Sequence, residues 1–521
     1  MQRKYIVVTG GVLSGLGKGI AMASIGNILS SSYKVVPIKC DGYLNVDPGT
    51  MNPTEHGEVF VLDDGGEVDM DFGHYERFLG VTCKFDWNLT MGRVFDEIRK
   101  KERKGDYLGH TVQMIPHVSN FIRDHFLKVG EESKADVVMI EVGGTIGDME
   151  NELYLDAIRS LARKVGRENI LFVHLTYVPI PHGVDEQKSK PTQQNINLLR
   201  QKGIDPDIVI ARCSEMLTEK VRSKIAKFGN LDFDKVLTGI DVDDVYKIPL
   251  SFEEQGLSQL LARSLNMPIN VDLREWKCLI EKREAATKEI VIGIAGKYTS
   301  LEDSYASIVE ALKHCEANCG VRIKVKWIDT EKDFDLSDVD GVIVPGGFGS
   351  RGTEGKIDVI SYCRERGVPF LGICYGLQMA VIEFARNVCG LENANSTEVD
   401  GDCVHPVVDI LEDQKDVENK GGTMRLGACT AYIKKGSKVF SLYGSEEVSE
   451  RHRHRYEVNP EYHEALEGKG LVLSGVSPDG TLVEFVELEN HPYFVATQAH
   501  PELKSSLLKP APLFMGLVSA C

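Results

Sequence analysis

The 521-residue chain has no long apolar run, since none approaches the ~18–20 residues that a helix needs to cross a bilayer. Its first residues, MQRKYIVVTGG, lack the apolar core and small-residue cleavage site of a secretion signal. The net charge of −18 leaves no basic excess for a general nucleic-acid or membrane-surface binder, although local lysines can still hold phosphates. We therefore expect a cytoplasmic protein that binds neither nucleic acid nor membrane.

The twelve cysteines are scattered rather than arranged at disulfide or zinc spacing, which is typical of a reduced protein. The tightest pair, Cys315 and Cys319, lies beside His314 in the helical pattern SYASIVEALKHCEANC. No second ligand pair follows at zinc spacing. The pattern therefore favours a helix surface near its C-terminal end over a metal site.

Two α/β patterns divide the chain, which is too long for one hydrophobic core. Over residues 1–265, short β-branched runs such as KYIVVTG and DVVMIEVGG alternate with helical patterns, which predicts a parallel sheet covered on both faces. A proline followed by a charged helical stretch over residues 266–288 indicates a linker. A second α/β pattern occupies residues 289–521, so we expect an α/β protein of two domains.

The second pattern contains the groups that cleave a carboxamide. Cys374 lies between the strand-like FLGIC and the helical YGLQMAVIEFAR, where the positive end of the helix dipole stabilises a thiolate. Gly372 and Gly376 flank this turn, where a side chain would crowd a sharp elbow. In TQAHPE, His500 can act as the base and Glu502 can orient its ring.

A glycine-rich segment, PGGFG at residues 345–349, follows a buried strand and can offer backbone N–H groups to an oxyanion. Taken alone, Cys374 would be interpreted as a buried structural cysteine. The elbow, PGGFG and HPE together instead favour catalysis. They resemble the class I glutamine amidotransferase domain, with GICYGLQ in place of the more usual GICLGMQ.

The first pattern begins with VVTGGVLSGLGKG, a glycine-rich turn between a strand and a helix that predicts a phosphate-binding loop. Lys18 would reach the terminal phosphates, but Gly19 stands where Ser or Thr would bind Mg²⁺, so an ordinary strand–turn–helix stays an alternative. Asp71 and Glu141 could supply the missing metal ligands. The loop DEQKSKPTQ (185–193) suits a triphosphate, although lysine-rich loops are usually only solvated.

Together these motifs resemble the CTP synthase family, whose members aminate UTP with ammonia from glutamine. The resemblance extends from Lys4 to about Leu517 and includes EVGGTIGDMENE, PGGFGSRGTEGK and ERHRHRYEVNP. It implies a P-loop-type, Rossmann-like ATP/UTP-binding synthetase domain followed by a class I glutamine amidotransferase domain. It also implies a cytoplasmic homotetramer, able in some relatives to form filaments, with Mg²⁺, ATP as co-substrate, GTP as activator and CTP as inhibitor.

The resemblance assigns roles to matching residues. The ATP–Mg²⁺ site would comprise Ser14, Gly15, Leu16, Gly17, Lys18, Gly19, Lys39, Asp71 and Glu141, with Arg212, Asp241 and Val242 around the adenine. The UTP site would comprise Lys188, Ser189, Lys190, Pro191, Thr192, Gln193 and Lys224, with Asp148 and Glu150 shared with inhibition by CTP. The glutamine pocket would comprise Gly347, Tyr375, Gly376, Leu377, Gln378, Glu398 and Arg455. His56 and Val59 match an ammonia passage, and Arg425 matches a lid loop linked to GTP.

Several positions depart from the family pattern: Tyr375 replaces leucine, Ala499 and Leu503 replace aromatic residues, Ile240 stands at a position that is often basic, and Gly42 replaces a proline and should loosen a loop near the nucleotide. Two other functions stay open at this point. One is an ATP-dependent amidotransferase with another acceptor, against which the KPTQ loop and ENANSTE favour UTP. The other is an assembly protein whose nucleotide sites only regulate polymerisation, against which the intact Cys374, His500 and Glu502 argue.

Overall fold

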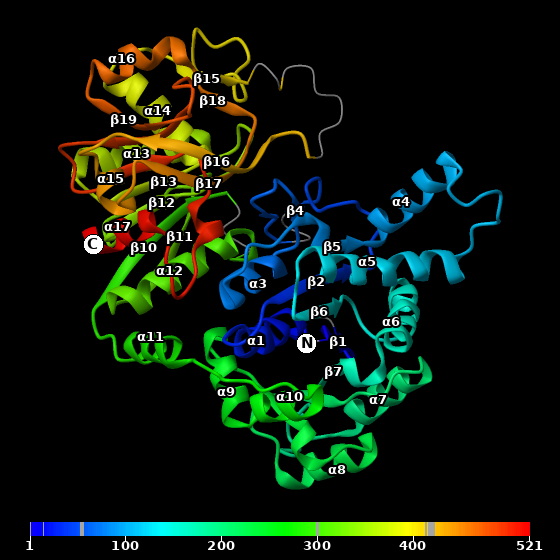
Figure 1. Ribbon diagram of the computed structural model, residues 1–521. Coiled ribbons are helices and arrows are strands. Elements are labelled where there is room, and N and C mark those ends of the chain that lie inside the picture. The colour runs from blue at the N-terminus through cyan, green and yellow to red at the C-terminus, as the bar shows by residue number, and fades with distance from the viewer. Residues whose placement is uncertain (1, 14, 53–56, 298–301, 412–413, 415–421) are drawn as a thin grey trace. The chain divides into compact units, whose positions relative to one another are not determined.

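The computed structural model describes residues 2–13, 15–52, 57–297, 302–411, 414 and 422–521 (Figure 1). It divides into two compact units, one formed by Met1–Asp47 and His74–Lys277 and the other by Pro48–Gly73 and Cys278–Cys521. Within the described residues, no helix combines the length and apolarity that a membrane crossing requires. The limits 1–265, 266–288 and 289–521 stay a prediction for the functional domains.

The first unit is built on a parallel seven-stranded sheet in the order β5-β2-β6-β1-β7-β8-β9. Its strands are β1 (Lys4–Gly10), β2 (Val35–Asp41), β5 (Asn88–Thr90), β6 (Val137–Val142), β7 (Ile170–Tyr177), β8 (Ile208–Cys213) and β9 (Val236–Ile240). All residues of β1, β2 and β6 are buried, as expected for strands covered on both faces. The predicted α/β fold is therefore confirmed for this unit.

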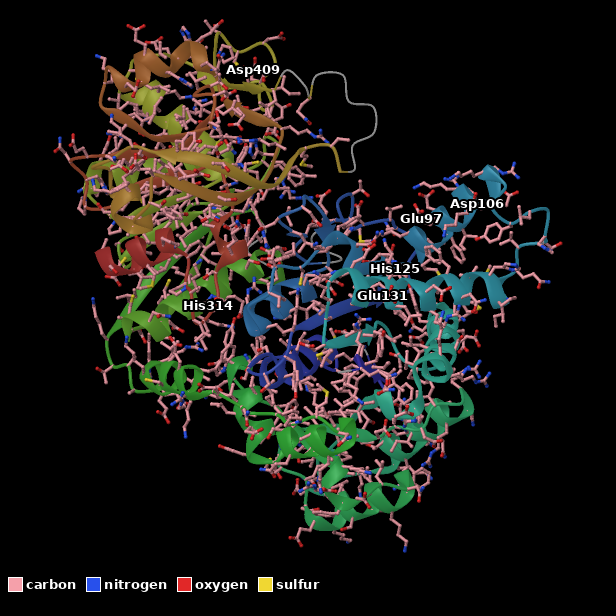
Figure 2. The ribbon with its side chains drawn as sticks, viewed as in Figure 1. Glu97, Asp106, His125, Glu131, His314 and Asp409 are labelled. Carbon is pink, nitrogen blue, oxygen red and sulfur yellow. The ribbon has the colours of Figure 1, made fainter. Side chains whose placement is uncertain are left out.

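Helices connect these strands, and polar caps set several of their ends. They are α1 (Lys18–Ser30), α4 (Met91–Lys104), α5 (Ser119–Glu132), α6 (Glu152–Val165), α7 (Lys190–Gln201), α8 (Glu219–Gly229), α9 (Ile248–Glu254) and α10 (Leu257–Leu265). Two further helices, α3 (Asp71–Leu79) and α11 (Arg274–Glu284), each contain a boundary between the two units. The Thr90 side chain accepts a hydrogen bond from Arg93 at the start of α4, which ends at the left-handed Gly105. His125 on α5 (Figure 2) lies 2.8 Å from the Asp86 carbonyl and joins α5 to the segment before β5.

The second unit contains a nine-stranded sheet in the order β11-β10-β12-β13-β21-β20-β19-β16-β17, whose first five strands are parallel. Its strands are β10 (Glu289–Gly296), β11 (Arg322–Asp329), β12 (Gly341–Val344), β13 (Phe370–Ile373), β16 (Arg425–Ile433), β17 (Glu447–His454), β19 (Leu471–Val476), β20 (Val483–Leu488) and β21 (Phe494–Thr497). Along β12, Val342 and Val344 enter one core cluster and Ile343 enters another, because alternate side chains face opposite sides of a sheet. Both faces are therefore buried.

Smaller sheets and further helices complete the described part of this unit. The sheets are β3 (Phe60–Val61) with β4 (Glu67–Val68), and β14 (Ala394–Ser396) with β15 (His405–Ile410) and β18 (Tyr456–Val458). The helices are α12 (Ala306–Cys319), α13 (Thr353–Arg366), α14 (Tyr375–Asn387), α15 (Lys438–Tyr443), α16 (His463–Glu467) and α17 (Pro512–Ala520).

The α12 helix corrects one detail of the sequence prediction. His314 and Cys315 lie in the core rather than on a helix surface, and His314, labelled in Figure 2, is 2.9 Å from the Ser505 hydroxyl. Among the residues described, no group of three or more His, Cys, Asp or Glu side chains could hold a metal ion. These side chains therefore support packing.

The Pro48–Gly73 segment joins the second unit, although sequence order placed it with the first sheet. Its Asp63 pairs with Arg451 at 2.5 Å, and its Glu67 pairs with Arg453 at 2.7 Å, both arginines lying on β17. The Ala428 amide donates a hydrogen bond to the Asp63 carbonyl at 2.9 Å. Ion pairs and a backbone bond thus hold this segment against the mixed sheet.

Candidate active site

Cys374 occupies the turn between β13 and α14 with φ 52° and ψ −102°, a conformation that non-glycine residues rarely adopt. Two glycines make this elbow sterically feasible. A Cβ on Gly376 would lie 2.1 Å from the Val344 carbonyl oxygen, and one on Gly372 would lie 2.8 Å from the Ala496 Cβ. The prediction that side chains would crowd the elbow is confirmed.

Sheet order brings the three predicted catalytic segments together. β12 leads into PGGFG, β13 leads into Cys374, and β21 is followed by His500, and these three strands are parallel neighbours. The carboxyl ends of parallel strands meet at one edge of a sheet. A Cβ added to Gly346 would lie 2.9 Å from Cε1 of His500 and 3.7 Å from the Cβ of Cys374, so the glycine loop contacts both side chains.

His500 is half-buried and pairs with the buried Glu502, with Nδ1 of His500 2.7 Å from Oε1 of Glu502. Burial alone would lower the pKa of His500, but the negative charges of Glu502 and Cys374 outweigh burial and raise this pKa well above its usual value. Among the described residues, Nε2 of His500 has no hydrogen-bond partner. The ring is therefore held at one nitrogen and can exchange a proton at the other.

Glu502→Gln tests this electrostatic pairing. The variant keeps the side-chain shape but removes the charge, so the pKa of His500 should fall and glutamine hydrolysis should drop roughly 100-fold. A pH profile of kcat/KM checks the prediction, because the limb that reports His500 should move to lower pH. The pair also stabilises the fold below the unfolded pKa of ~6.5, and this stabilisation is lost as pH rises through the raised folded pKa. An unshifted limb would contradict the pairing.

A cavity of about 670 Å³ adjoins Cys374, His500 and Glu502. Its wall includes the predicted glutamine-pocket residues Gly347, Gln378, Glu398 and Arg455, together with the predicted passage residue Val59. Tyr375, Gly376 and Leu377 are instead buried beneath the site, and His56 lies outside the described residues. The structure therefore brings most, but not all, of the predicted glutamine residues to one cavity.

Sequence reasoning missed several residues around the nucleophile. Nε2 of Gln498 lies 3.6 Å from Sγ of Cys374, and the Gln378 amide donates a hydrogen bond to Oε1 of Gln498 at 3.3 Å. Arg453 also lines the cavity, and its carbonyl oxygen lies 3.8 Å from the sulfur. Gln498 lies two residues before His500 in the segment that follows β21, so its closeness in sequence to the base was the only available signal.

Gly346→Ala tests the close approach of the glycine loop. The added methyl group would meet Cε1 of His500, so the ring should shift and glutamine hydrolysis should fall roughly 100-fold. Gly401→Ala is the matched control, because its added Cβ has no neighbour within 4 Å in the part of the chain that the structure describes. A steady-state glutaminase assay compares the two variants. Equal rates for both variants would contradict contact between the loop and the base.

Arg425 begins β16 and is largely buried, with ion pairs to Glu457 at 2.8 Å and Glu484 at 2.5 Å. Burial raises the pKa of Glu457 to about 8, and Arg425 offsets only part of this effect. The arginine is thus anchored in a strand, and its predicted link to a lid loop stays a prediction.

The phosphate-binding loop of the first unit lies at the carboxyl edge of its sheet. Gly15 and Gly17 have φ of 69° and 86°, and Lys18 donates a hydrogen bond to the Gly144 carbonyl at 2.7 Å. Arg212, at the end of β8, donates to the Gly15 carbonyl at 2.9 Å and pairs with Asp241 at 2.6 Å. Predicted phosphate and adenine residues thus contact one another.

The remaining members of the predicted ATP set lie within this loop, at the start of α1, after β9 or outside the described residues. Leu16 is buried, Gly19 lies in the first turn of α1, and Val242 follows Asp241 after β9, whereas Ser14 lies outside the described residues.

Lys39 and Glu141 face each other across neighbouring strands β2 and β6, with Nζ 3.1 Å from Oε1. The Tyr75 hydroxyl donates to the other oxygen of Glu141 at 2.5 Å. Mg²⁺ needs only one or two carboxylates beside phosphate oxygens, so Glu141 at this strand end fits a nucleotide-bound Mg²⁺. Asp71 begins α3 and belongs to the second unit.

The predicted UTP segment starts helix α7 beside β7. Thr192 donates to the Tyr177 carbonyl at 3.0 Å, and Gln193 donates to the Ser189 hydroxyl at 3.1 Å, with Pro191 in the first turn. Lys190 is exposed at the start of α7.

Lys188 in this segment, together with Lys220 and Lys224, contributes cationic charge. Lys188 pairs with Glu186 at 2.6 Å. The hydrogen bond and charge of Lys188 lower the pKa of Glu186, with smaller contributions from the charges of Lys220 and Lys224. The segment is therefore ordered by its own hydrogen bonds, with cationic side chains beside it.

The sequence predicts a loosened loop at Gly42, but the structure shows a close approach of two segments there instead. Its added Cβ would lie 2.5 Å from the Cβ of Glu150, so the glycine allows two segments to approach closely. Nearby, the Asp148 side chain accepts a hydrogen bond from the Thr145 amide at 2.8 Å. The predicted CTP-related residues Asp148 and Glu150 thus lie at exposed positions after β6, with the Glu150 backbone and Cβ close to Gly42.

Comparisons with known proteins cover the whole chain. The family described as CTP synthase N-terminus matches residues 4–267, and the family described as glutamine amidotransferase class-I matches residues 300–520. A CTP synthase of Borreliella afzelii is 50% identical over 99% of this chain and 99% of its own length. A CTP synthase of Archaeoglobus fulgidus is also 50% identical, over 99% and 98%.

A solved structure described as the Trypanosoma brucei CTPS glutaminase domain with bound acivicin is 38% identical, with a TM-score of 0.41, and covers 44% of this chain and 93% of that one. The family matches and the full-length relatives agree with the catalytic elbow in one unit and the phosphate loop in the other. The chain therefore belongs to the CTP synthase family of glutamine-dependent ligases.

Proposed function

We propose that this chain converts UTP to CTP by an ATP-dependent amination that takes its nitrogen from glutamine. The observation that carries the proposal is the presence, in one chain, of a Cys374–His500 elbow at one parallel sheet edge and a Lys18 phosphate loop at another. The first arrangement suits release of ammonia, and the second suits activation of an acceptor by a nucleotide.

Glutamine hydrolysis uses the elbow directly. The thiolate of Cys374 attacks the side-chain carboxamide, and backbone N–H groups at residues 346–348 of the glycine loop stabilise the oxyanion. Protonated His500 gives its Nε2 proton to the leaving nitrogen, so that ammonia departs and a glutamyl thioester remains. His500 then takes a proton from water, which attacks the thioester and releases glutamate. Glu502 holds the ring and stabilises its charged form.

Glutamine would be oriented by the charged side chains at the cavity wall. Glu398 suits the α-ammonium group and Arg455 suits the α-carboxylate, because each offers the opposite charge. The Arg455 guanidinium is itself held by the Thr423 hydroxyl at 3.0 Å. The proposed orientation points the carboxamide end of glutamine toward Cys374.

Ammonia would leave along the wall that the Pro48–Gly73 segment provides. Val59 and Val61 line the same cavity as Cys374 and give an apolar surface, which favours neutral ammonia over ammonium. Glu58 at this wall accepts hydrogen bonds from the amide and hydroxyl of Ser307, which fixes the segment in place. His56 completes the proposed passage by resemblance.

In the synthetase half, ATP would phosphorylate the 4-oxygen of UTP, ammonia would attack carbon 4, and phosphate would leave. Lys18 and Lys39 would stabilise the charge on the transferring phosphoryl group. Glu141 would hold a Mg²⁺ ion, whose charge would neutralise the phosphates when bound. The segment 188–193, with Lys224, would hold the UTP triphosphate, and Arg212, Asp241 and Val242 would surround the adenine of ATP.

Regulation and assembly are part of the same proposal: a cytoplasmic homotetramer activated by GTP and inhibited by CTP. Leu108, Met114 and Ile115 near α4 are 86%, 57% and 58% exposed, and such apolar side chains support contact with a second copy. Asp148 and Glu150 would contribute to CTP inhibition.

An assay of CTP formation with ATP, UTP, Mg²⁺ and glutamine, with and without GTP, tests the whole proposal. Phosphate release with another acceptor, but not with UTP, would favour a different amidotransferase. Absence of CTP with both glutamine and ammonia would favour a purely structural role.

A further inference from the structure

Tyr375 follows the nucleophile but faces away from the glutamine cavity. The residue is 1% exposed, and its hydroxyl donates a hydrogen bond to the Gly349 carbonyl at 2.7 Å. The same hydroxyl lies 3.1 Å from Oγ1 of Thr353, which also bonds the Ser350 carbonyl at 2.9 Å. The Tyr375 side chain thus reaches from the start of α14 to the far end of the PGGFG loop.

Gly349 is held from its other side by a residue of the cavity wall. Its amide donates to Oε1 of Glu398 at 2.9 Å, so both polar groups of this glycine are engaged. Gly349 has φ +74°, and no atom of the described residues lies within 4 Å of an added Cβ. Hydrogen bonds rather than side-chain packing therefore fix this end of the loop, since glycine itself allows many conformations.

The Tyr375 ring is also confined. Nζ of Lys356 lies 4.6 Å from the ring centroid, and Lys356 is 1% exposed. A Cβ on Gly347 would lie 3.4 Å from the same Nζ and 3.8 Å from Cδ1 of Tyr375, so lysine and ring both lie beneath the loop. The leucine that is usual in the family at this position has no hydroxyl with which to bond Gly349.

We propose that Tyr375 is a positioning residue for glutamine hydrolysis: it holds the Gly346–Gly349 loop where the loop's N–H groups meet the developing oxyanion. The inference rests on the proposed glutaminase function and assigns a role to a residue that does not line the cavity. Donors act on a transition state only when they are already in position, so loosening this anchor should slow turnover more than it weakens binding.

Tyr375→Phe removes only the hydroxyl. Loss of one such hydrogen bond predicts a fall of about 3–10-fold in kcat for glutamine hydrolysis with KM for glutamine unchanged. The rate at which iodoacetamide alkylates Cys374 should equal that of the wild type, because displacement of iodide needs no oxyanion donors. Mass spectrometry of the peptide that contains Cys374 measures this rate. CTP formation from ammonia should also stay unchanged.

Tyr493→Phe is the matched control. Tyr493 is buried in the same unit, and its hydroxyl donates to the Leu513 carbonyl at 2.7 Å, so the variant loses the same type of bond away from the cavity. Wild-type kcat in Tyr375→Phe, an equal fall in Tyr493→Phe, or a parallel fall in Cys374 alkylation would each overturn the inference. Failure of the proposed function looks different, because wild-type protein would then not hydrolyse glutamine, or Cys374→Ala would still do so.

Discussion

Cys374→Ala is expected to lower glutamine-dependent CTP formation by ~1,000-fold or more, because the attacking thiolate is lost. CTP formation from added ammonia should remain at the wild-type rate. The structure places the phosphate loop in the other compact unit, at the edge of a separate sheet. A spectrophotometric assay with each nitrogen source in turn measures both rates on the same preparation.

Cys363→Ala is the matched control for this variant. Cys363 is also buried in the second unit, but it belongs to α13 and packs in a core cluster rather than lining the cavity. The Cys363→Ala variant should keep both activities. Its stability should fall only modestly, because the side chain removed is small. If Cys374→Ala lost glutamine-dependent and ammonia-dependent turnover equally, separate sites for the two half-reactions would be contradicted.

Lys18→Ala is expected to lower CTP formation roughly 1,000-fold with either nitrogen source, because the lysine would stabilise charge on the transferring phosphoryl group. Its position supports this role, since Nζ reaches the Gly144 carbonyl across the carboxyl edge of the first sheet. Hydrolysis of glutamine in the absence of nucleotides should be unchanged. Comparing CTP formation with glutaminase activity separates the two units' contributions.

Lys34→Ala supplies the control, because it removes one positive charge from an exposed position of the same unit. It should retain CTP formation, which would show that the loss in Lys18→Ala is local and not an effect of net charge. A Lys18→Ala protein that failed only with glutamine, and worked normally with ammonia, would contradict a phosphate-binding role.

Features that depend on a local sequence pattern could be predicted from the sequence. The strand runs before Gly10 and Cys374 gave the parallel sheets, and the elbow was identified because a buried run passes directly into a helix through glycines. The association of Cys374 with His500 and Glu502 was predicted from chemistry, and the adjacency of β13 and β21 accounts for it.

Features that depend on distant pairing could not be predicted in this way. The attachment of Pro48–Gly73 to the second unit depends on ion pairs between Asp63 and Arg451 and between Glu67 and Arg453, whose partners are almost 400 residues apart. Charged residues are usually expected at the surface, so the sequences of these two segments do not indicate that they contact each other. For the same reason, the burial of Arg425 by Glu457 and Glu484 was not apparent.

The most direct test of the account follows the nitrogen itself. Glutamine labelled with heavy nitrogen in its amide is supplied with ATP, UTP and Mg²⁺ in the presence of excess unlabelled ammonium, and the CTP formed is analysed by mass spectrometry. If ammonia passes from Cys374 along the Val59 wall to the acceptor, most CTP should carry the label. CTP that carries only the small share of label expected from mixing with the ammonium pool would contradict the account.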